Sequence, residues 1–329
     1  MAVTTRMRDD IRYGYAVGRV RVLEGRLLSR GTFERLLDAP DLREQKRVLA
    51  ETHIGRYLES AESAAEVERA LETSLGDLYE EFLERADLPS AVVQYFRLPH
   101  DYANLRATVK ARLLDIEPPG ALSTLGSVPV EAFSQPATLP EPLASTAAVW
   151  GEYETLPDLD EVEADVDQAL FAALDEAARE SKVRFLRELT ALRIDLANVR
   201  VLMRARAKAV SVGSLAERMM PGGTSALEDL AYTAPRMSAA DLADAIVETR
   251  ALSHVTANDL VDLERYDLLA DALVAERMAA ARRAPNGAEP VLAYVLAREA
   301  EVLVLRTIVV GRLSGLDSES VRSRLRGQL

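Results

Sequence analysis

The stretch Asp101-Tyr102-Ala103-Asn104-Leu105-Arg106 decides the fold, because the chain repeats it twice more. The second copy is Asp195-Leu196-Ala197-Asn198-Val199-Arg200 and the third is Glu301-Val302-Leu303-Val304-Leu305-Arg306. Each copy leads, after four further residues, to a small residue and a closing arginine: Ala111-Arg112, Ala205-Arg206 and Gly311-Arg312. The copies lie much further apart than the roughly 20–50 residues of a solenoid repeat. The pattern therefore predicts three related helical units in a pseudo-threefold arrangement, which favours a collar, socket or adaptor over an enzyme with a pocket.

The first group of residues in the repeat belongs to the apolar side of its helix. On a helix that turns about 100° per residue, the acid, the Asn and the closing Arg fall within the aliphatic stripe. The acid and the closing Arg are too far apart along one helix to pair with each other, and a buried unpaired charge is very costly. We therefore expect pairing with neighbouring helices that fixes their register, with a contact to another subunit as the alternative. This structural repeat network comprises Asp101, Asn104, Arg112, Asp195, Asn198, Arg206, Glu301 and Arg312.

The second group of residues in the repeat is basic and falls on the opposite face of each helix. Such a face is usually only solvated, but here it is also a candidate surface for binding a central partner. In the third copy Val310 replaces the second basic residue and Val304 replaces the Asn, which argues against a strictly symmetric ligand. The candidate residues of this binding surface are Arg106, Lys110, Arg200, Arg204 and Arg306.

The composition favours packed helices. Of the 329 residues 48% are hydrophobic and only 5% are aromatic, whereas β-sandwiches depend on aromatic and β-branched strands. A net charge of −13 argues against nucleic-acid binding, which requires basic stripes. The chain has no cysteine, which excludes disulfides and zinc–thiolate sites. We see no signal peptide and no apolar run of the roughly 20 residues that span a bilayer, so any membrane association is expected to be peripheral.

The order of helical patterns and breakers predicts an all-α chain in four approximate segments. The first unit is expected over residues 1–117, with Pro99-His100 preceding the helix of the first copy. A proline-rich linker or loop over 118–143 separates it from the second unit at 144–209, and the third unit follows at 210–329. A decayed fourth copy that ends in Gly25-Arg26 predicts that the N-terminal helix packs near the C-terminal helix.

Motifs of catalysis and cofactor binding are missing. There is no phosphate-binding loop and no dinucleotide fingerprint; Gly222-Gly223-Thr224-Ser225 lacks the required lysine and is interpreted as a turn and helix cap. The three histidines have no di-iron spacing. Asn258-Asp259 with Asp262 lacks the second acidic motif of a terpene cyclase or prenyl transferase, the enzyme alternative. We therefore expect no catalytic, cofactor-binding or metal-binding residues and no small-molecule substrate.

Four motifs together resemble the C subunit of V/A-type ATP synthases, the counterpart of the d subunit in eukaryotic V-ATPases. They are the opening Tyr13-Gly14-Tyr15-Ala16-Val17-Gly18-Arg19-Val20-Arg21, the first copy from Asp101 to Lys110, the second from Asp195 to Arg200, and Pro290-Val291-Leu292-Ala293-Tyr294 with Glu299, Glu301, Leu305 and Arg306. The match covers nearly the whole chain in the right order. Glu301 in place of Asp, Val304 in place of Asn and the long segment from Pro118 to Pro142 depart from the family pattern.

This resemblance implies a funnel of three similar helical domains without an active site. Such a protein sits peripherally on the cytoplasmic face of the membrane, held by protein contacts to the proteolipid ring. It receives the central stalk and transmits torque for ion-driven ATP synthesis or ATP-driven pumping. The alternative from the residues alone is a generic helical scaffold for another protein partner.

Overall fold

The computed structural model describes residues 13–86, 88–117, 122–150, 159–208, 212–252 and 255–325, and only the backbone of 206–208 and 212–214. Helices make up the regular structure of these residues, with no strand among them, which confirms the all-α prediction. The chain divides into two compact units, one made of residues 1–88 with 275–329 and the other of 89–274.

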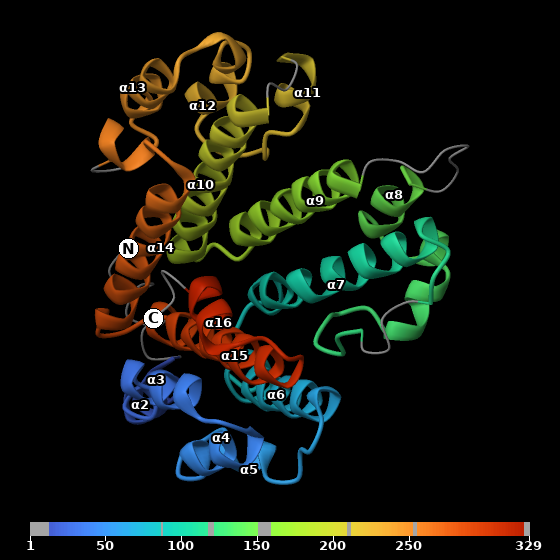
Figure 1. Ribbon diagram of the computed structural model, residues 1–329, viewed down its shortest axis with the longest axis vertical. Coiled ribbons are helices and arrows are strands. Elements are labelled where there is room, and N and C mark those ends of the chain that lie inside the picture. The colour runs from blue at the N-terminus through green and yellow to red at the C-terminus, as the bar shows by residue number, and fades with distance from the viewer. Residues whose placement is uncertain are drawn as a thin grey trace, which may run out of the picture. The chain divides into compact units, whose positions relative to one another are not determined.

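The first unit combines both ends of the chain. Its long central helix is α15 (Glu289–Leu313), which packs against α6 (Ala64–Tyr79), α2 (Gly14–Glu24) and α3 (Arg30–Asp38). The N-terminal helix α2 thus lies against the helix of the third copy, and the C-terminal α16 (Ser318–Arg324) packs on α15 and α3 (Figure 1). The remaining elements are α4 (Leu42–Leu49), α5 (Gly55–Leu58) and the π-helical turn η1 (Glu80–Glu84).

The second unit contains the first two copies. Helix α9 (Leu159–Glu180) packs against both repeat helices, α7 (Ser90–Leu113) and α10 (Arg184–Lys208), as Figure 1 shows. Its other elements are η2 (Val130–Ser134), η3 (Pro136–Thr138), α8 (Leu143–Ala148), α11 (Val212–Glu217), α12 (Ser225–Leu230), η4 (Ala234–Arg236), α13 (Ala239–Thr249) and η5 (Ala257–Leu260). The boundary between the two units falls inside α14 (Leu263–Arg283).

Local sequence explains where the main helices begin. Ser63 and Glu66 form a reciprocal capping box at the start of α6, and the buried Val67, Leu71 and Leu75 follow at intervals of four residues. Pro290 occupies the first turn of α15, where its missing N–H has no helical partner to lose. Helix α7 runs through Pro99, so the expected helix start at Pro99-His100 is wrong: the helix begins nine residues earlier, at Ser90.

The short helices that follow each repeat helix of the second unit pack on that repeat helix. The apolar side chains of the described residues after α10, such as Leu227, Ile246 and Tyr266, share one core with Val199 and Leu202 of α10. Within the expected linker η2 packs on α7 and Phe133 is buried, and α8, which begins at the last linker residue, also packs on α7. Each repeat helix of this unit is therefore followed by short helices that cover it and then by a long partner helix.

Candidate functional site

The acid and the fourth residue of each copy are buried in all three repeat helices. Asp101 and Asn104 are 1% and 2% exposed, Asp195 and Asn198 are 6% and 0% exposed, and Glu301 and Val304 are 5% and 4% exposed. Burying a carboxylate raises its pKa unless donors compensate it, so the partners of these side chains decide what the repeat does.

In the first copy the two side chains hold the loop that follows α7. Asn104 receives a hydrogen bond from the Ser123 backbone N–H at 2.7 Å and donates through Nδ2 to the Ser123 carbonyl at 2.8 Å. Asp101 accepts from the N–H groups of Ser127 and Val128, each at 3.0 Å, and from the Ser127 hydroxyl at 2.6 Å. We call this arrangement, in which the acid of a repeat helix and a second polar side chain bind the backbone of one loop, a clamp.

The second copy repeats the clamp with the same spacing. Asn198 binds the Met220 peptide at 2.6 Å and 3.0 Å, and Asp195 accepts from the N–H and the hydroxyl of Thr224 at 2.7 Å and 2.8 Å. In both loops the residue that binds the acid lies four positions after the residue that binds the amide. Burial raises the pKa of Asp195, and the two hydrogen bonds from Thr224 oppose that rise.

A glycine stands directly over the acid in both of these loops. A Cβ on Gly126 would overlap the Asp101 carboxylate, and a Cβ on Gly223 would lie 2.7 Å from Asp195 Oδ1, inside van der Waals contact. The stretch Gly222-Gly223-Thr224, predicted as a turn and cap, is therefore a clamp partner: Thr224 occupies the N-cap position of α12, but its side chain makes no cap hydrogen bond and binds Asp195 instead.

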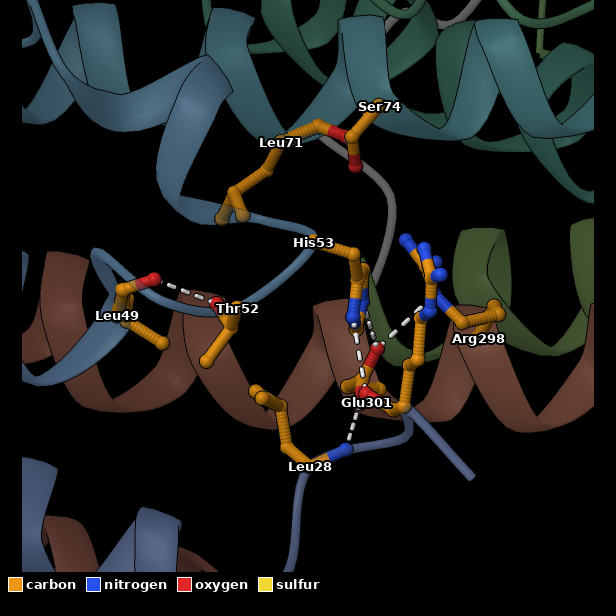
Figure 2. A network of polar contacts seen from close by, with 9 residues as sticks. Leu28, Leu49, Thr52, His53, Leu71, Ser74, Arg298 and Glu301 are labelled. Atoms are coloured by element: carbon orange, nitrogen blue, oxygen red, sulfur yellow. Dashed lines mark hydrogen bonds and ion pairs between the residues drawn. The ribbon is translucent and has the colours of Figure 1, made fainter. Parts of the chain in front are cut away.

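The third clamp has an acid at the same position but different partners. Val304 has no amide, and Glu301 binds the N-terminal segment, accepting a hydrogen bond from the Leu28 N–H in the turn between α2 and α3. His53 contacts the second carboxylate oxygen at 2.8 Å, and Arg298 Nε lies 2.9 Å from the same oxygen (Figure 2). The N-terminal part of the chain thus supplies to α15 the loop that α7 and α10 receive from downstream.

The inner arginine of each copy makes an ion pair with a long partner helix. Arg106 pairs with Asp167 of α9, and Lys110 one turn later pairs with Glu163 of the same helix. Arg200 pairs with Asp267 of α14 at 2.7 Å, and Arg306 pairs with Glu68 of α6 at 2.6 Å. These side chains are partly exposed, and such pairs contribute at most about 1 kcal/mol each. The basic face therefore lies at helix–helix contacts in three copies.

The remaining predicted residues do not join the clamps. Arg112 is exposed, so the expectation that it lies buried in the apolar stripe of its helix is wrong; its long side chain reaches water from the end of α7. Arg312 is half-buried and donates to the Leu316 carbonyl at 3.2 Å. The side chain of Arg206 lies outside the described residues. Arg204 is exposed and has no ion pair with the described part of the chain.

Sequence reasoning missed the partners of the clamps. It treats His53 only as one of three histidines, and it does not select Arg298, Ser127 or the acids of the partner helices. A signal is present in the two loops: Gly-Ser at 126–127 and Gly-Thr at 223–224 follow their copies at nearly equal distances. No comparable signal marks Leu28, because the third loop precedes its helix by most of the chain.

The donors and acceptors of the first two clamps satisfy one another. Among the described residues, no group of three His, Cys, Asp or Glu side chains is placed to hold a metal ion. Nor does any helix described here combine the length and the hydropathy needed to cross a membrane. The arrangement is suited to fixing helices and loops in register.

Comparison with known proteins supplies the family. The model of the ATP synthase (C/AC39) subunit family matches residues 16–324. The chain is 27% identical to the C subunit of the A-type ATP synthase of Thermococcus onnurineus, over 94% of this chain and 89% of that protein. The corresponding C subunits of Methanocaldococcus jannaschii and Thermococcus kodakarensis are 25% and 27% identical, over 98% and 94% of this chain and 88% and 89% of their own lengths. The protein therefore belongs to the ATP synthase (C/AC39) subunit family.

Proposed function

We propose that this chain is the non-catalytic rotor subunit of an A-type ATP synthase, a socket that links the central stalk to the membrane proteolipid ring and transmits torque between them. The observation that carries the proposal is the clamp, which recurs on three long helices. A part that transmits torque must keep its helices in register under load, and buried, fully paired polar groups fix register better than apolar contacts alone.

The proposed assembly has three clamped units arranged around a pseudo-threefold axis as a funnel that receives the stalk. Each unit would consist of a repeat helix, a clamped loop, short covering helices and a partner helix, and the third would be completed by the N-terminal segment. The protein would lie peripherally on the cytoplasmic face of the membrane, held by contacts to the ring. The match to relatives named as C subunits of A-type ATP synthases supports this assignment.

Arg204 is the best candidate for a stalk-facing cation. Arg106, Lys110, Arg200 and Arg306 form ion pairs with partner helices, so reversing their charge would disturb the fold as well as a binding surface. Arg204 is exposed at a cavity of about 230 Å³ that Asp160, Glu163 and Arg218 also line. A charge reversal there removes a surface cation without breaking a described ion pair.

Reconstitution tests the proposal. The full chain, mixed with the central-stalk proteins of the same ATP synthase, should elute from size exclusion as a stoichiometric complex. The complex should in turn bind detergent-solubilised proteolipid ring. A chain that binds neither the stalk proteins nor the ring would contradict the proposed socket function and favour the generic helical scaffold.

A pair of variants tests the stalk-facing residue. Arg204→Glu should weaken stalk binding at an unchanged melting temperature. The matched control is Arg187→Glu, which also reverses an exposed arginine of α10 without breaking a described ion pair and should leave binding intact. Equal binding by both variants would remove Arg204 from the interface while leaving the socket itself untouched.

A further inference from the structure

His53 is held between two hydrogen-bond acceptors. Its Nδ1 lies 3.0 Å from the backbone carbonyl oxygen of Arg26, and its Nε2 lies 2.8 Å from Glu301 Oε2. A neutral imidazole carries one N–H donor and one bare nitrogen, whereas the imidazolium carries two donors. Only the protonated ring satisfies both contacts, because the neutral ring would press a lone pair against an oxygen.

This histidine takes the place of the missing amide. In the first two copies the Asn side chain bonds the loop backbone and has no charge to lose. Val304 cannot do so in the third copy, and His53 bonds the loop carbonyl of Arg26 instead. The same ring carries the bond on to Glu301, which also accepts from the Leu28 N–H (Figure 2). The turn between α2 and α3 is therefore tied to α15 twice: by the Leu28 N–H, and by the His53 ring, whose tie depends on its proton.

The cations around His53 come from several elements. Arg298 of α15 lies 2.9 Å from the same Glu301 oxygen and is only 6% exposed. Arg19 of α2, Arg26 of the turn and Arg56 of α5 line the cavity of about 360 Å³ beside the ring. Arg298 leaves a cation beside Glu301 when His53 loses its proton, so the carboxylate keeps a partner while the contact from His53 to the turn breaks.

The acids and phenols of the same cavity are engaged elsewhere. Glu81 pairs with Arg19, and Asp77 accepts from the Tyr57 hydroxyl at 2.6 Å. Burial raises the pKa of Tyr294 above its ordinary value, so this phenol stays neutral through the range in which histidine titrates. Glu301 is thus the carboxylate that accepts a hydrogen bond from the protonated His53 ring.

We propose that the third clamp is a proton-dependent latch: protonated His53 fastens the turn between α2 and α3 to α15 through the Arg26 carbonyl and Glu301, and loss of its proton breaks this fastening and leaves the turn held by the Leu28 N–H. The first two clamps hold at any pH at which Asp101 and Asp195 are ionised. The latch is a property of the chain itself and does not depend on the proposed partners.

Urea unfolding from pH 5.5 to 8.5 tests the latch. The comparison is between the full chain and His53→Gln, whose side chain is neutral throughout. The protein should lose its advantage over the variant as the pH rises, with the ratio of their unfolding constants shrinking by about tenfold, the worth of one charge-assisted hydrogen bond. The matched control is His100→Gln, because His100 faces the Ser123 hydroxyl at 3.1 Å, a group able to donate or accept. Its difference from the parent should not change with pH.

If His53→Gln does not fold, a second measurement tests the latch in the unmodified chain. Nitrogen-15 spectra of the unmodified chain should show both His53 ring nitrogens protonated at pH 5.5. The Leu28 amide resonance should shift as the ring titrates, while the Thr224 amide, which is held by Asp195, stays in place. The latch would be overturned if the stability difference between the parent and His53→Gln were constant with pH. It would also be overturned if the Leu28 amide resonance did not shift while His53 titrates.

Discussion

The clamps of α7 and α10 differ from the clamp of α15 in how they hold their loops. In the first two, an Asp and an Asn bind both ends of a five-residue span with a glycine over the acid. In the third, a longer Glu and a histidine hold a loop from the N-terminal part of the chain, and a buried arginine contacts the Glu. The comparison teaches that the shared element is an acid on a repeat helix that pins a loop backbone, while the second contact varies with the origin of the loop.

The largest expected effect comes from filling the space above the acid. Gly126→Ala or Gly223→Ala places a methyl group where the carboxylate lies, so the loop must move and leave a buried charge with fewer donors. We expect a loss of about 3 kcal/mol for each in urea unfolding.

Gly18→Ala on α2 is the matched control for these variants. Its added methyl group meets nothing within 4 Å, and alanine favours a helix, so stability should rise by about 0.5–1 kcal/mol. Clamp variants as stable as the parent would show that the acid and the loop do not touch as described.

A smaller effect is expected when the second copy is made to resemble the third. Asn198→Val removes the amide and strands the buried N–H and C=O of Met220, which should cost about 2 kcal/mol. Calorimetric unfolding of the full chain measures this loss. If it stays below about 0.5 kcal/mol, the amide is not the second anchor, and the distinction between the two kinds of clamp collapses.

The ion pairs of the repeat helices should contribute less. Arg200→Gln and Arg306→Gln each remove one pair at a partly exposed site, with an expected loss of about 0.5 kcal/mol. A double-mutant cycle with Asp267→Asn or Glu68→Gln isolates the pairwise term. A coupling energy well above about 1 kcal/mol would show that these pairs stabilise the repeat helices more than exposed ion pairs usually do.

The smallest effect is a pH dependence at the start of α6. Hydrogen bonds from the backbone of Glu62 and from Ser63 lower the pKa of Glu66. A carboxylate whose pKa is lower in the folded chain stabilises it above the unfolded value of about 4.3, and this contribution is lost as the pH falls below it. The melting temperature of Glu66→Ala should therefore approach that of the parent between about pH 5 and 3, and a gap that widens on acidification would contradict the assigned cap.

The fold can be predicted from sequence wherever one helix determines its own pattern. Spacing alone locates the repeat helices, and Ser238 is recognisable as the N-cap of α13, where it forms a capping box with Asp241. The partners of the buried acids are not predictable in the same way, because the contacts join residues that a helical period does not relate. The hydrogen bond between Leu28 and Glu301 is the extreme case, since no sequence pattern near either residue predicts the other as its partner.

The interpretation of the basic face shows a second limit. A helical wheel places Arg106 and Arg200 opposite the buried acid, but it does not say whether water or another helix covers that side. The acids of α9 and α14 that meet them are ordinary surface residues in sequence. Only the tertiary packing turns a candidate binding surface into helix–helix contacts.

Hydrogen exchange of four loop amides tests the central claim, that each repeat helix pins a loop, most directly. The N–H groups of Ser127, Val128, Thr224 and Leu28 lie outside helices, yet each donates to a buried carboxylate. At pH 6 all four should exchange far more slowly than unstructured amides. Asp101→Ala should release Ser127 and Val128 while Thr224 and Leu28 stay protected. Fast exchange of these amides in the unmodified chain, or a uniform loss of protection in the variant, would contradict separate clamps.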